Sequence, residues 1–441
     1  MAKSTGIVLH PKLAKFTKAA SGRLDLADVI VKPSFKMPYI NTGSTVLNIL
    51  IGGSRLEDGS FVCPGYPKGK IIEIFGRESS GKSTFALMAM GHACQQNGNT
   101  GCGLYVDNES AVSDSYSMKL GCDFRPPELG GSGQAIRIAP HTFEETAAYV
   151  NIAALNGVDL IVIDSVAGLV SQREYERDTT DDKQKLGVAE VPRLMSGWMP
   201  KLQGIIARTG TTVIFLNQTR DKIGPEVKFA RTEEAKKSTV GGNALKFWAS
   251  LRWLLVPKQS AKAKVFNPLT KEVEEIPVAT DVLVKNIKNK IDARQGHTGL
   301  VTLRYGVGID EMRTMMNVAE AYNIVTTKST KGKPTIYTFK DPESGTTVEA
   351  NGIERFRMAL KKNEDSFRSL NSLCVEMIMK GFKAIDDEQL ALLAEDAVIV
   401  KTDEDDEYED NSGGPTIVDP EEMEVDDGVG INDGPSMESL S

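Results

Sequence analysis

A short glycine-containing segment between an apolar run and a helical pattern constrains the fold of this chain most strongly. Residues 76–83 read Gly-Arg-Glu-Ser-Ser-Gly-Lys-Ser, the complete G-x-x-x-x-G-K-[ST] pattern of a phosphate-binding loop. The apolar run Ile71-Ile72-Glu73-Ile74-Phe75 precedes the loop, and residues 84–90 follow it with a helical pattern. A strand that delivers such a loop and a helix that leaves it direct backbone N–H groups and the positive helix end at phosphates. The segment therefore predicts a strand–loop–helix unit that binds a nucleoside triphosphate.

The residues of this loop have separate expected tasks. Gly76 and Gly81 let the backbone approach closely where a Cβ would clash. Lys82 is expected to reach the β- and γ-phosphates, and the Ser83 hydroxyl is expected to bind Mg²⁺. A chance glycine-rich turn is the alternative, and the flanking patterns argue against it. The predicted nucleotide-binding residues are Gly76, Arg77, Glu78, Ser79, Ser80, Gly81, Lys82, Ser83 and Thr84.

The charge of the chain is divided unevenly along its length. Residues 402–441 hold 15 of the 60 acidic residues and no Lys or Arg, so the preceding 401 residues carry 52 basic against 45 acidic side chains, a net charge of +7. A mildly basic body with an acidic tail suggests a polyanionic partner and a tail that competes with it. A tail that only aids solubility is the alternative.

The sequence carries no sign of a membrane span or of an export signal. No apolar run reaches the roughly 20 residues that cross a bilayer, and the N-terminus lacks the apolar core of a secretory signal. The five cysteines include no C-x-x-C pair, which is typical of reduced thiols and not of a disulfide framework or a zinc site. We therefore expect a cytoplasmic protein with no membrane partner.

Short apolar runs alternate with helical patterns through most of the chain. The runs predict strands at residues 71–76, 104–107, 136–138, 160–164 and 212–216, and the helical patterns fall near 82–97, 113–120, 142–156 and 187–208. Near-continuous apolar strands separated by helices predict a parallel sheet covered on both faces. Strands in succession at 250–255, 281–285 and 300–305 predict an antiparallel extension of the same sheet.

These patterns divide the chain into four expected parts. Residues 1–38 form an N-terminal arm, which is too short to bury a core alone and is expected to pack on a neighbouring subunit. Residues 39–310 form the α/β core. Residues 311–400 form a small α+β domain with helices near 352–362 and 366–380. Residues 401–441 are acidic and poor in aromatic residues, so we expect a disordered tail.

Two further strand ends carry carboxylates suited to nucleotide chemistry. Leu160-Ile161-Val162-Ile163-Asp164 describes a buried strand that presents Asp164 at its end, where it can hold Mg²⁺ through water. Glu109 follows the strand 104–107 and is placed to orient and deprotonate a water aimed at the γ-phosphate. Chemistry alone does not separate Glu109 from Asp107 for this task. Asp107 is equally suited to capping the helix that follows.

Together with the loop, several blocks resemble bacterial RecA recombinases in their order and spacing. These blocks are residues 76–84, 107–109 with Lys119-Leu120-Gly121 behind them, 164–167, 217–224 and 241–247. The likeness covers residues 38–310 well and 311–390 loosely, and its divergence is similar to that of bacteriophage recombinases of the UvsX/RecA type. A phage origin would place the protein in the host cytoplasm.

The resemblance implies a fold and an activity. It implies an α/β, RecA-like P-loop ATPase core with a largely parallel central sheet, and ATP and Mg²⁺ as cofactors. It also implies a helical filament of many copies on single-stranded DNA, which pairs that strand with homologous duplex DNA in recombination and DNA repair. Single-strand-binding or mediator proteins are further expected partners.

The resemblance also assigns tasks to single positions. Glu109 matches the catalytic glutamate, Tyr116 an aromatic residue that stacks on adenine, and Gln218 the sensor of the γ-phosphate. Lys288 and Lys290 match lysines that reach the ATP of the neighbouring subunit; from the sequence alone they would be solvated strand-end lysines. The first DNA loop corresponds to roughly residues 171–187. The implied DNA-contacting residues are Arg193, Ser196, Arg220, Lys222, Ile223, Gly241, Gly242 and Asn243.

The segment 219–240 has an independent physical argument. It lies between an apolar strand and a Gly-Gly turn, shows no helical or alternating pattern, and holds six basic against four acidic residues. Loops longer than about 12–15 residues in a compact domain are usually functional or disordered. A slightly basic loop beside a nucleotide sensor suits a DNA strand that is gripped only when ATP is bound.

Some features depart from the family pattern, and two other functions share the fold. The link at residues 52–68 is longer than usual, and Asp178, Asp181 and Asp182 add acidic charge to the first loop. Pro192 and Pro200 are expected to interrupt the next helix, and Pro200 stands where the family commonly carries an arginine. One alternative function is a hexameric helicase, which usually carries an extra N-terminal domain that residues 1–37 are too few to form. The other is an ATP-binding recombination mediator. A mediator need not keep the residues for ATP hydrolysis, and this chain has them.

Overall fold

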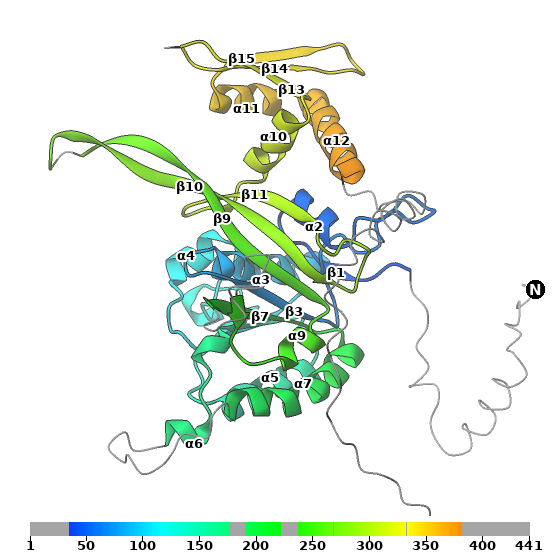
Figure 1. The fold of residues 1–441 in the computed structure, drawn as a ribbon, viewed down its shortest axis with the longest axis vertical. Helices are drawn as coiled ribbons and strands as arrows, with labels where there is room; N and C mark the ends of the chain where they lie inside the picture. Colours follow the sequence, from blue (N-terminus) through cyan, green and yellow to red (C-terminus); the bar gives the residue numbers. More distant parts are fainter. Residues whose placement is uncertain (1–34, 177–189, 222–236, 268, 332, 382–441) are drawn as a thin grey trace, which may run out of the picture. The chain divides into compact units, whose positions relative to one another are not determined.

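A computed structural model describes residues 35–176, 190–221, 237–267, 269–331 and 333–381. Its largest sheet has the strand order β12-β11-β10-β9-β3-β7-β6-β4-β5. Of these strands, β11, β10, β9, β3 and β7 are labelled in Figure 1. Five neighbouring strands of this sheet run parallel to one another, which confirms the predicted parallel sheet. They are β3 (Ile71–Gly76), β7 (Thr212–Asp221), β6 (Leu160–Asp164), β4 (Gly103–Asp107) and β5 (Ala135–Ile138).

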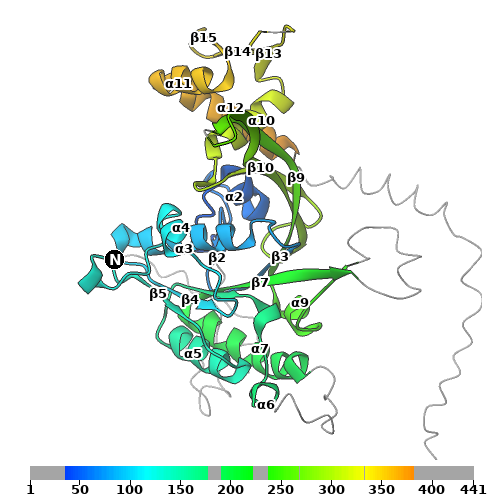
Figure 2. The same cartoon turned by 90° about the vertical axis from the view of Figure 1, so that its left-hand side faces the viewer.

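Both faces of this parallel sheet are covered by helices, as the apolar strands predict (Figure 2). In β6, Val162 packs into the cluster on one face and Ile163 into the cluster on the other, because successive strand side chains point to opposite faces. One face packs against α3 (Lys82–Asn99) and α4 (Asp114–Lys119), and the other packs against α5 (Phe143–Leu155), α7 (Glu190–Thr209) and α9 (Ala244–Trp248). The helix α2 (Thr45–Gly52) joins the first cluster but packs on the antiparallel extension of the sheet.

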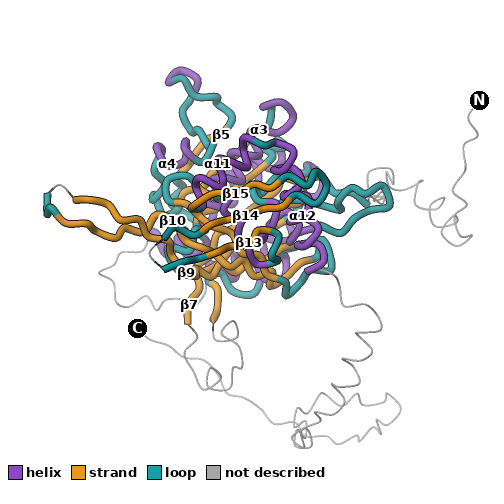
Figure 3. Tube along the Cα trace, turned by 90° about the horizontal axis from the view of Figure 1, so that it is seen from above, coloured by secondary structure: helices purple, strands orange, loops and turns teal. Residues whose placement is uncertain are grey.

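The predicted antiparallel extension is present, and its strands are longer than expected. β9 (Leu251–Asn267) pairs in parallel with β3 and antiparallel with β10 (Glu272–Asn289). β10 pairs antiparallel with β11 (Thr298–Arg304), which pairs antiparallel with β12 (Gly308–Ile309). The outer halves of β9 and β10 project as a two-stranded ribbon (Figure 3). Phe266, Val273 and Ile276 are exposed there. With no buried face to impose an alternating pattern, the sequence could not predict this part.

Residues 311–381 combine helices with a separate antiparallel sheet. The helices near 352–362 and 366–380 are confirmed. Met316, Phe339 and Phe356 join the same buried cluster as the side chains of α2 and α3, so buried packing continues past residue 310. The elements are α10 (Glu311–Ala321), β13 (Val325–Lys328), β14 (Ile336–Lys340), β15 (Thr347–Asn351), α11 (Ile353–Lys362) and α12 (Glu364–Gly381).

The remaining elements are short. They are β1 (Tyr39–Ile40), β2 (Tyr66–Pro67), β8 (Lys237–Thr239), α6 (Gln172–Tyr175) and the single 3₁₀ turns η1 (Pro127–Leu129) and η2 (Val166–Gly168). The predicted acidic tail and nearly all of the predicted N-terminal arm lie outside the described residues. All five cysteines are free thiols. Among the helices that the structure describes, none has the length and apolar character that a bilayer span requires.

The expectation that prolines interrupt the helix after the first DNA loop is wrong. α7 runs without a break from Glu190 to Thr209 and contains both prolines. Pro192 lies in the first turn, where a backbone N–H has no helical partner to lose. Pro200 lies inside the helix, where a proline removes one backbone hydrogen bond. Buried residues of α7, including Trp198 and Leu202, pack against the sheet and keep the helix intact.

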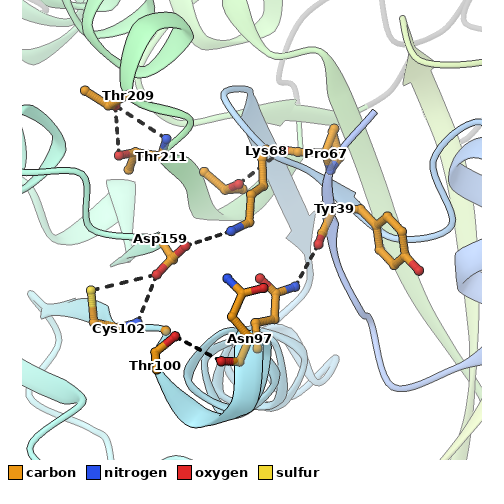
Figure 4. Close-up of polar contacts among 12 residues, drawn as sticks. Tyr39, Pro67, Lys68, Asn97, Thr100, Cys102, Asp159, Thr209 and Thr211 are labelled. Atoms are coloured by element: carbon orange, nitrogen blue, oxygen red, sulfur yellow. Dashed lines mark hydrogen bonds and ion pairs between the residues drawn. The ribbon is translucent and has the colours of Figure 1, made fainter. Parts of the chain in front are cut away.

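At the amino ends of the strands, one carboxylate joins three loops (Figure 4). Asp159, just before β6, accepts a hydrogen bond from the Lys68 ammonium at 2.7 Å and one from the Cys102 backbone N–H at 3.1 Å. Lys68 precedes β3 and Cys102 precedes β4, so the starts of the three strands are tied together. The predicted nucleotide-binding residues lie at the opposite, carboxyl ends.

Candidate nucleotide site and DNA-facing elements

The carboxyl ends of four neighbouring parallel strands gather the predicted nucleotide residues. The phosphate-binding loop follows β3, Gln218 lies on β7, Asp164 ends β6, and Glu109 follows β4. Ligands of open α/β sheets bind in the crevice outside the carboxyl ends of the strands. Residues spread over about a third of the sequence therefore meet at one edge of the sheet.

The two glycines of the loop have no room for side chains. A Cβ on Gly76 would lie 2.7 Å from Ser80 Oγ and 2.8 Å from the Leu255 backbone oxygen. Gly81 has φ +92°, and its Cβ would lie 2.4 Å from Leu303 Cδ1. Only glycine fits the close packing of the loop on β9 and β11.

Lys82 begins α3 with its ammonium group turned back onto the loop. Its Nζ donates to the backbone oxygens of Arg77 at 2.8 Å and Gly76 at 3.4 Å. Burial lowers the pKa of Lys82, while the carboxylates of Asp164, Glu109 and Glu78 oppose this shift. The two carbonyl oxygens are neutral acceptors. A phosphate group would give the Lys82 ammonium a charged partner and therefore a stronger hydrogen bond.

A hydroxyl and a carboxylate suited to Mg²⁺ lie side by side. Ser83 Oγ donates to Asp164 Oδ2 at 2.7 Å, and the buried Tyr105 hydroxyl donates to the same oxygen at 2.6 Å. Burial raises the pKa of Asp164, and these two hydrogen bonds oppose the rise. Oxygen donors of this kind fit Mg²⁺, which is usually held by one or two carboxylates together with substrate phosphates. Sequence reasoning missed Tyr105 because its ring reads as one more apolar strand residue.

The two carboxylates that chemistry could not separate have different surroundings. Asp107 is buried, and its oxygens accept the backbone N–H groups of Ala111 and Val112 at 3.3 and 3.4 Å. It therefore holds the loop before α4 and does not cap the helix itself. Glu109 is exposed at the strand edge, where its Oε1 accepts hydrogen bonds from Ser165 Oγ and, at 3.1 Å, from Gln218 Nε2. Only Glu109 faces the site.

A cavity of about 280 Å³ lies beside the phosphate-binding loop. Tyr116 lines it, and its hydroxyl is hydrogen-bonded to Thr84 Oγ1 at 2.8 Å. Thr280, Arg304 and Tyr305 line the same cavity from β10 and from the end of β11, and the Tyr305 hydroxyl is bonded to Thr280 Oγ1 at 3.0 Å. Sequence reasoning missed these three residues, because only the antiparallel extension of the sheet brings them to the loop.

Lys288 and Lys290 lie near the end of β10, away from this cavity. Lys288 Nζ donates to the backbone oxygens of Lys246 and Phe247, at 2.7 and 2.8 Å, and so caps the C-terminal end of α9. Burial, with the positive charges of Lys290 and Arg252, lowers the pKa of Lys288 to about 8. Lys290 is exposed, and so is Phe247, with 72% of its surface accessible. The pair therefore lies on an open face with an exposed aromatic side chain.

The described residues among the predicted DNA contacts fall into two adjacent groups. Arg193 and Ser196 are exposed near the start of α7. The Gly241–Gly242 turn packs on that helix start, since a Cβ on Gly242 would lie 3.0 Å from Pro192 Cβ. Asn243 is exposed at the N-cap of α9. Of Arg220 only the backbone is described, and Lys222 and Ile223 lie outside the described residues.

The segment expected to be an irregular loop at 219–240 is partly a strand pair. β7 continues to Asp221 and pairs antiparallel with β8, with Thr219 opposite Thr239. Residues 222–236 lie outside the described residues. In the first predicted DNA loop, residues 172–175 form α6, and Ser171 at its start donates a hydrogen bond to Glu190 of α7 at 2.8 Å.

Comparisons with known proteins identify the family of this chain. The family model described as the RecA N-terminal domain matches residues 31–310. A Protein RecA from Mesoplasma florum is 34% identical over 280 residues, which cover 63% of this chain and 74% of that protein. A Protein RecA from Bacteroides thetaiotaomicron is 34% identical over 352 residues, covering 78% of this chain and 89% of that protein. The chain therefore belongs to the RecA family of DNA-dependent ATPases that couple ATP hydrolysis to DNA strand exchange in recombination and repair.

Proposed function

We propose that this protein forms a filament on single-stranded DNA and pairs it with homologous duplex DNA, with hydrolysis carried out by Lys82, Glu109 and Gln218. The observation that carries the proposal is the convergence of the loop, Asp164, Glu109 and Gln218 at the ends of β3, β6, β4 and β7. The reaction is the hydrolysis of ATP to ADP and phosphate.

In this proposal the loop binds the triphosphate and Lys82 offsets its charge. Backbone N–H groups at the start of α3 and the Lys82 ammonium would bind the β- and γ-phosphates. Ser83 and, through water, Asp164 would hold Mg²⁺, which when bound would offset phosphate charge. Tyr116 would stack on adenine in the cavity that it lines with Tyr305. These residues bind and orient the substrate.

Gln218 would report the presence of the γ-phosphate. In this structure its amide donates to Glu109 Oε1 at 3.1 Å. A γ-phosphate oxygen competes for that donor, because a hydrogen bond to an ionised phosphate is stronger than most alternatives. When Gln218 leaves Glu109, the carboxylate loses one of its two hydrogen bonds and can accept the proton of the attacking water, while Ser165 still holds it in place. Since Gln218 belongs to β7, its movement would also act on the strand pair β7–β8 and on the turn at residues 240–242 that follows. We call this turn, which carries the predicted DNA contacts Gly241 and Gly242, the DNA-facing turn.

The filament would bring a second set of residues to each ATP. Lys288 and Lys290 would reach the nucleotide of the neighbouring subunit, and the exposed Phe247 lies on the same face. We also expect the arm at residues 1–38 to contact a neighbour, the acidic tail to compete with DNA, and single-strand-binding or mediator proteins to assist loading. A cytoplasmic location, in a host cell if the protein comes from a phage, fits this function.

Electron microscopy of the protein with single-stranded DNA and a slowly hydrolysed ATP analogue tests the proposal. Continuous helical filaments are expected, and they should be absent with ADP. Closed rings would favour a helicase, and isolated particles would favour a mediator. Either result would contradict the proposed filament.

A further inference from the structure

A fully buried carboxylate lies in the middle of the strand that carries the phosphate-binding loop. Glu73 of β3 is 0% exposed and forms a salt bridge with Arg252 of β9, whose side chain is 12% exposed. Burying two charges costs free energy that their attraction repays only with good geometry, and apolar residues of similar volume are often as stable. Stability alone therefore does not account for a charged pair at this position.

The pair belongs to a row of polar side chains that crosses four neighbouring strands. Glu73 is the register partner of Arg252, and Arg252 is the register partner of Lys288 on β10. On the other side of Glu73, Asn217 of β7 is fully buried and donates its Nδ2 to Glu73 Oε1 at 2.9 Å. The Arg252 guanidinium also lies 4.8 Å from the centroid of the Phe75 ring, which restricts its position. We call Lys288, Arg252, Glu73 and Asn217 the polar row.

One end of the polar row contacts both the nucleotide sensor and the DNA-facing turn. Asn217 Oδ1 accepts the backbone N–H of Gln218 at 2.9 Å. Asn217 Nδ2 also donates to the Val240 backbone oxygen at 2.9 Å, directly before the Gly241–Gly242 turn. One amide group thus holds the residue that meets the γ-phosphate and the chain segment that leads to the DNA contacts.

The other end of the polar row contacts the open face of α9. Lys288 donates to the backbone oxygens of Lys246 and Phe247 at the C-terminal end of that helix. Lys288 is the residue expected to reach the ATP of a neighbouring subunit. The polar row therefore begins beside the ATP site of its own subunit, at Asn217. It ends at Lys288, on the face that would meet the ATP of the neighbouring subunit.

We propose that Glu73, Arg252 and Asn217 are positioning residues that couple the nucleotide state sensed at Gln218 to the DNA-facing turn and to Lys288. This inference rests on the proposed function. When the Gln218 side chain turns from Glu109 to a γ-phosphate, a shift of its backbone N–H moves Asn217, whose other bonds run to Val240 and Glu73. Buried hydrogen bonds allow few alternative geometries, so the shift passes to both partners.

The coupling is measurable as a ratio of affinities. The affinity of the full chain for a single-stranded DNA oligonucleotide is measured with a slowly hydrolysed ATP analogue and again with ADP. Typical coupling between two sites changes affinity 5- to 150-fold, and the reciprocal effect of DNA on nucleotide affinity has the same size. In the double variant Glu73→Gln/Arg252→Gln, which removes both charges and keeps similar shapes, we expect the ratio to fall at least about fivefold. Nucleotide affinity without DNA should stay unchanged.

A second variant and a matched control keep the test decisive. Asn217→Ala, which leaves the charged pair in place, should lower the same ratio if the double variant does not fold. The control is Asp310→Asn/Arg357→Gln, which removes a pair of similar burial that joins the N-cap of α10 to α11, outside the row. It should keep the ratio even if it lowers the melting temperature equally.

The outcomes separate this inference from the function on which it rests. A wild-type ratio near one would contradict the nucleotide-dependent DNA binding of the proposed function. A large wild-type ratio that survives in folded polar-row variants would overturn only the coupling role. An equal loss in the control variant would also overturn it, because the effect would then follow stability and not position.

Discussion

The contrast between Glu109 and Asp107 supports a prediction with a worked magnitude. Glu109→Gln keeps the shape of an exposed side chain but removes the group that accepts the proton from water. Loss of a general base typically lowers turnover about 10²- to 10⁴-fold, which corresponds to about 3–5 kcal/mol of activation free energy. Because Glu109 is exposed, its replacement should change the free energy of unfolding by no more than about 0.5 kcal/mol.

Asp107→Asn should show the opposite pattern. The buried Asp107 carboxylate accepts two backbone N–H groups at 3.3 and 3.4 Å, and an amide can accept only one of them without turning its own N–H₂ toward the other. Hydrogen bonds to charged groups contribute about 1.5–3 kcal/mol each, and these two are long. We therefore expect a loss of about 1–3 kcal/mol in the free energy of unfolding. Turnover of the folded fraction should fall much less than in Glu109→Gln.

Two assays on the same preparations decide the question. Phosphate release is measured at saturating ATP and single-stranded DNA, and the free energy of unfolding is measured by urea denaturation. Glu109→Gln should bind ATP and DNA and hold its filaments longer than the wild type. If Asp107→Asn abolishes turnover while Glu109→Gln stays active, the assignment of the base to Glu109 is refuted.

Four further predictions concern the charges of the site and the tail. Lys82→Ala should abolish DNA-stimulated ATP hydrolysis while circular dichroism shows an intact fold; a normal rate would refute the loop assignment. Changing Lys288 and Lys290 together to Ala should spare ATP binding by the isolated subunit and remove DNA stimulation. Since burial lowers the pKa of Lys288 to about 8, the charged form is present below that pH and lost above it. DNA-stimulated turnover should thus decline above about pH 8, and Lys288→Arg should remove this decline. Deleting residues 402–441 removes 15 acidic residues and leaves a net charge of +7. The affinity for duplex DNA should therefore rise at low salt and converge with that of the wild type at high salt. Equal affinities at every salt concentration would show that the tail does not compete with DNA.

Much of this protein could be predicted from its sequence, because some patterns carry their own physical reason. Residues 76–83 describe a loop that only one local geometry satisfies, and apolar runs such as 160–164 must lie in a sheet covered on both faces. The parallel core, its helices and the antiparallel extension followed from such patterns. The resemblance to RecA, carried by blocks in fixed order, pointed to the family that the comparisons then showed.

Other features depend on which strands become neighbours, and no local pattern contains that information. Side-chain chemistry does not distinguish Asp107 from Glu109, and the resemblance to the family alone favours Glu109. Only the packing buries the first and exposes the second. Tyr305 enters the nucleotide cavity because the long β9–β10 pair carries β11 beside the loop. Glu73 reads as one polar residue in an apolar strand, and its partners Arg252 and Asn217 lie more than 140 positions away along the chain. Contacts between distant segments are set by the free energy of burying whole strands together, so tertiary structure alone assembles the polar row.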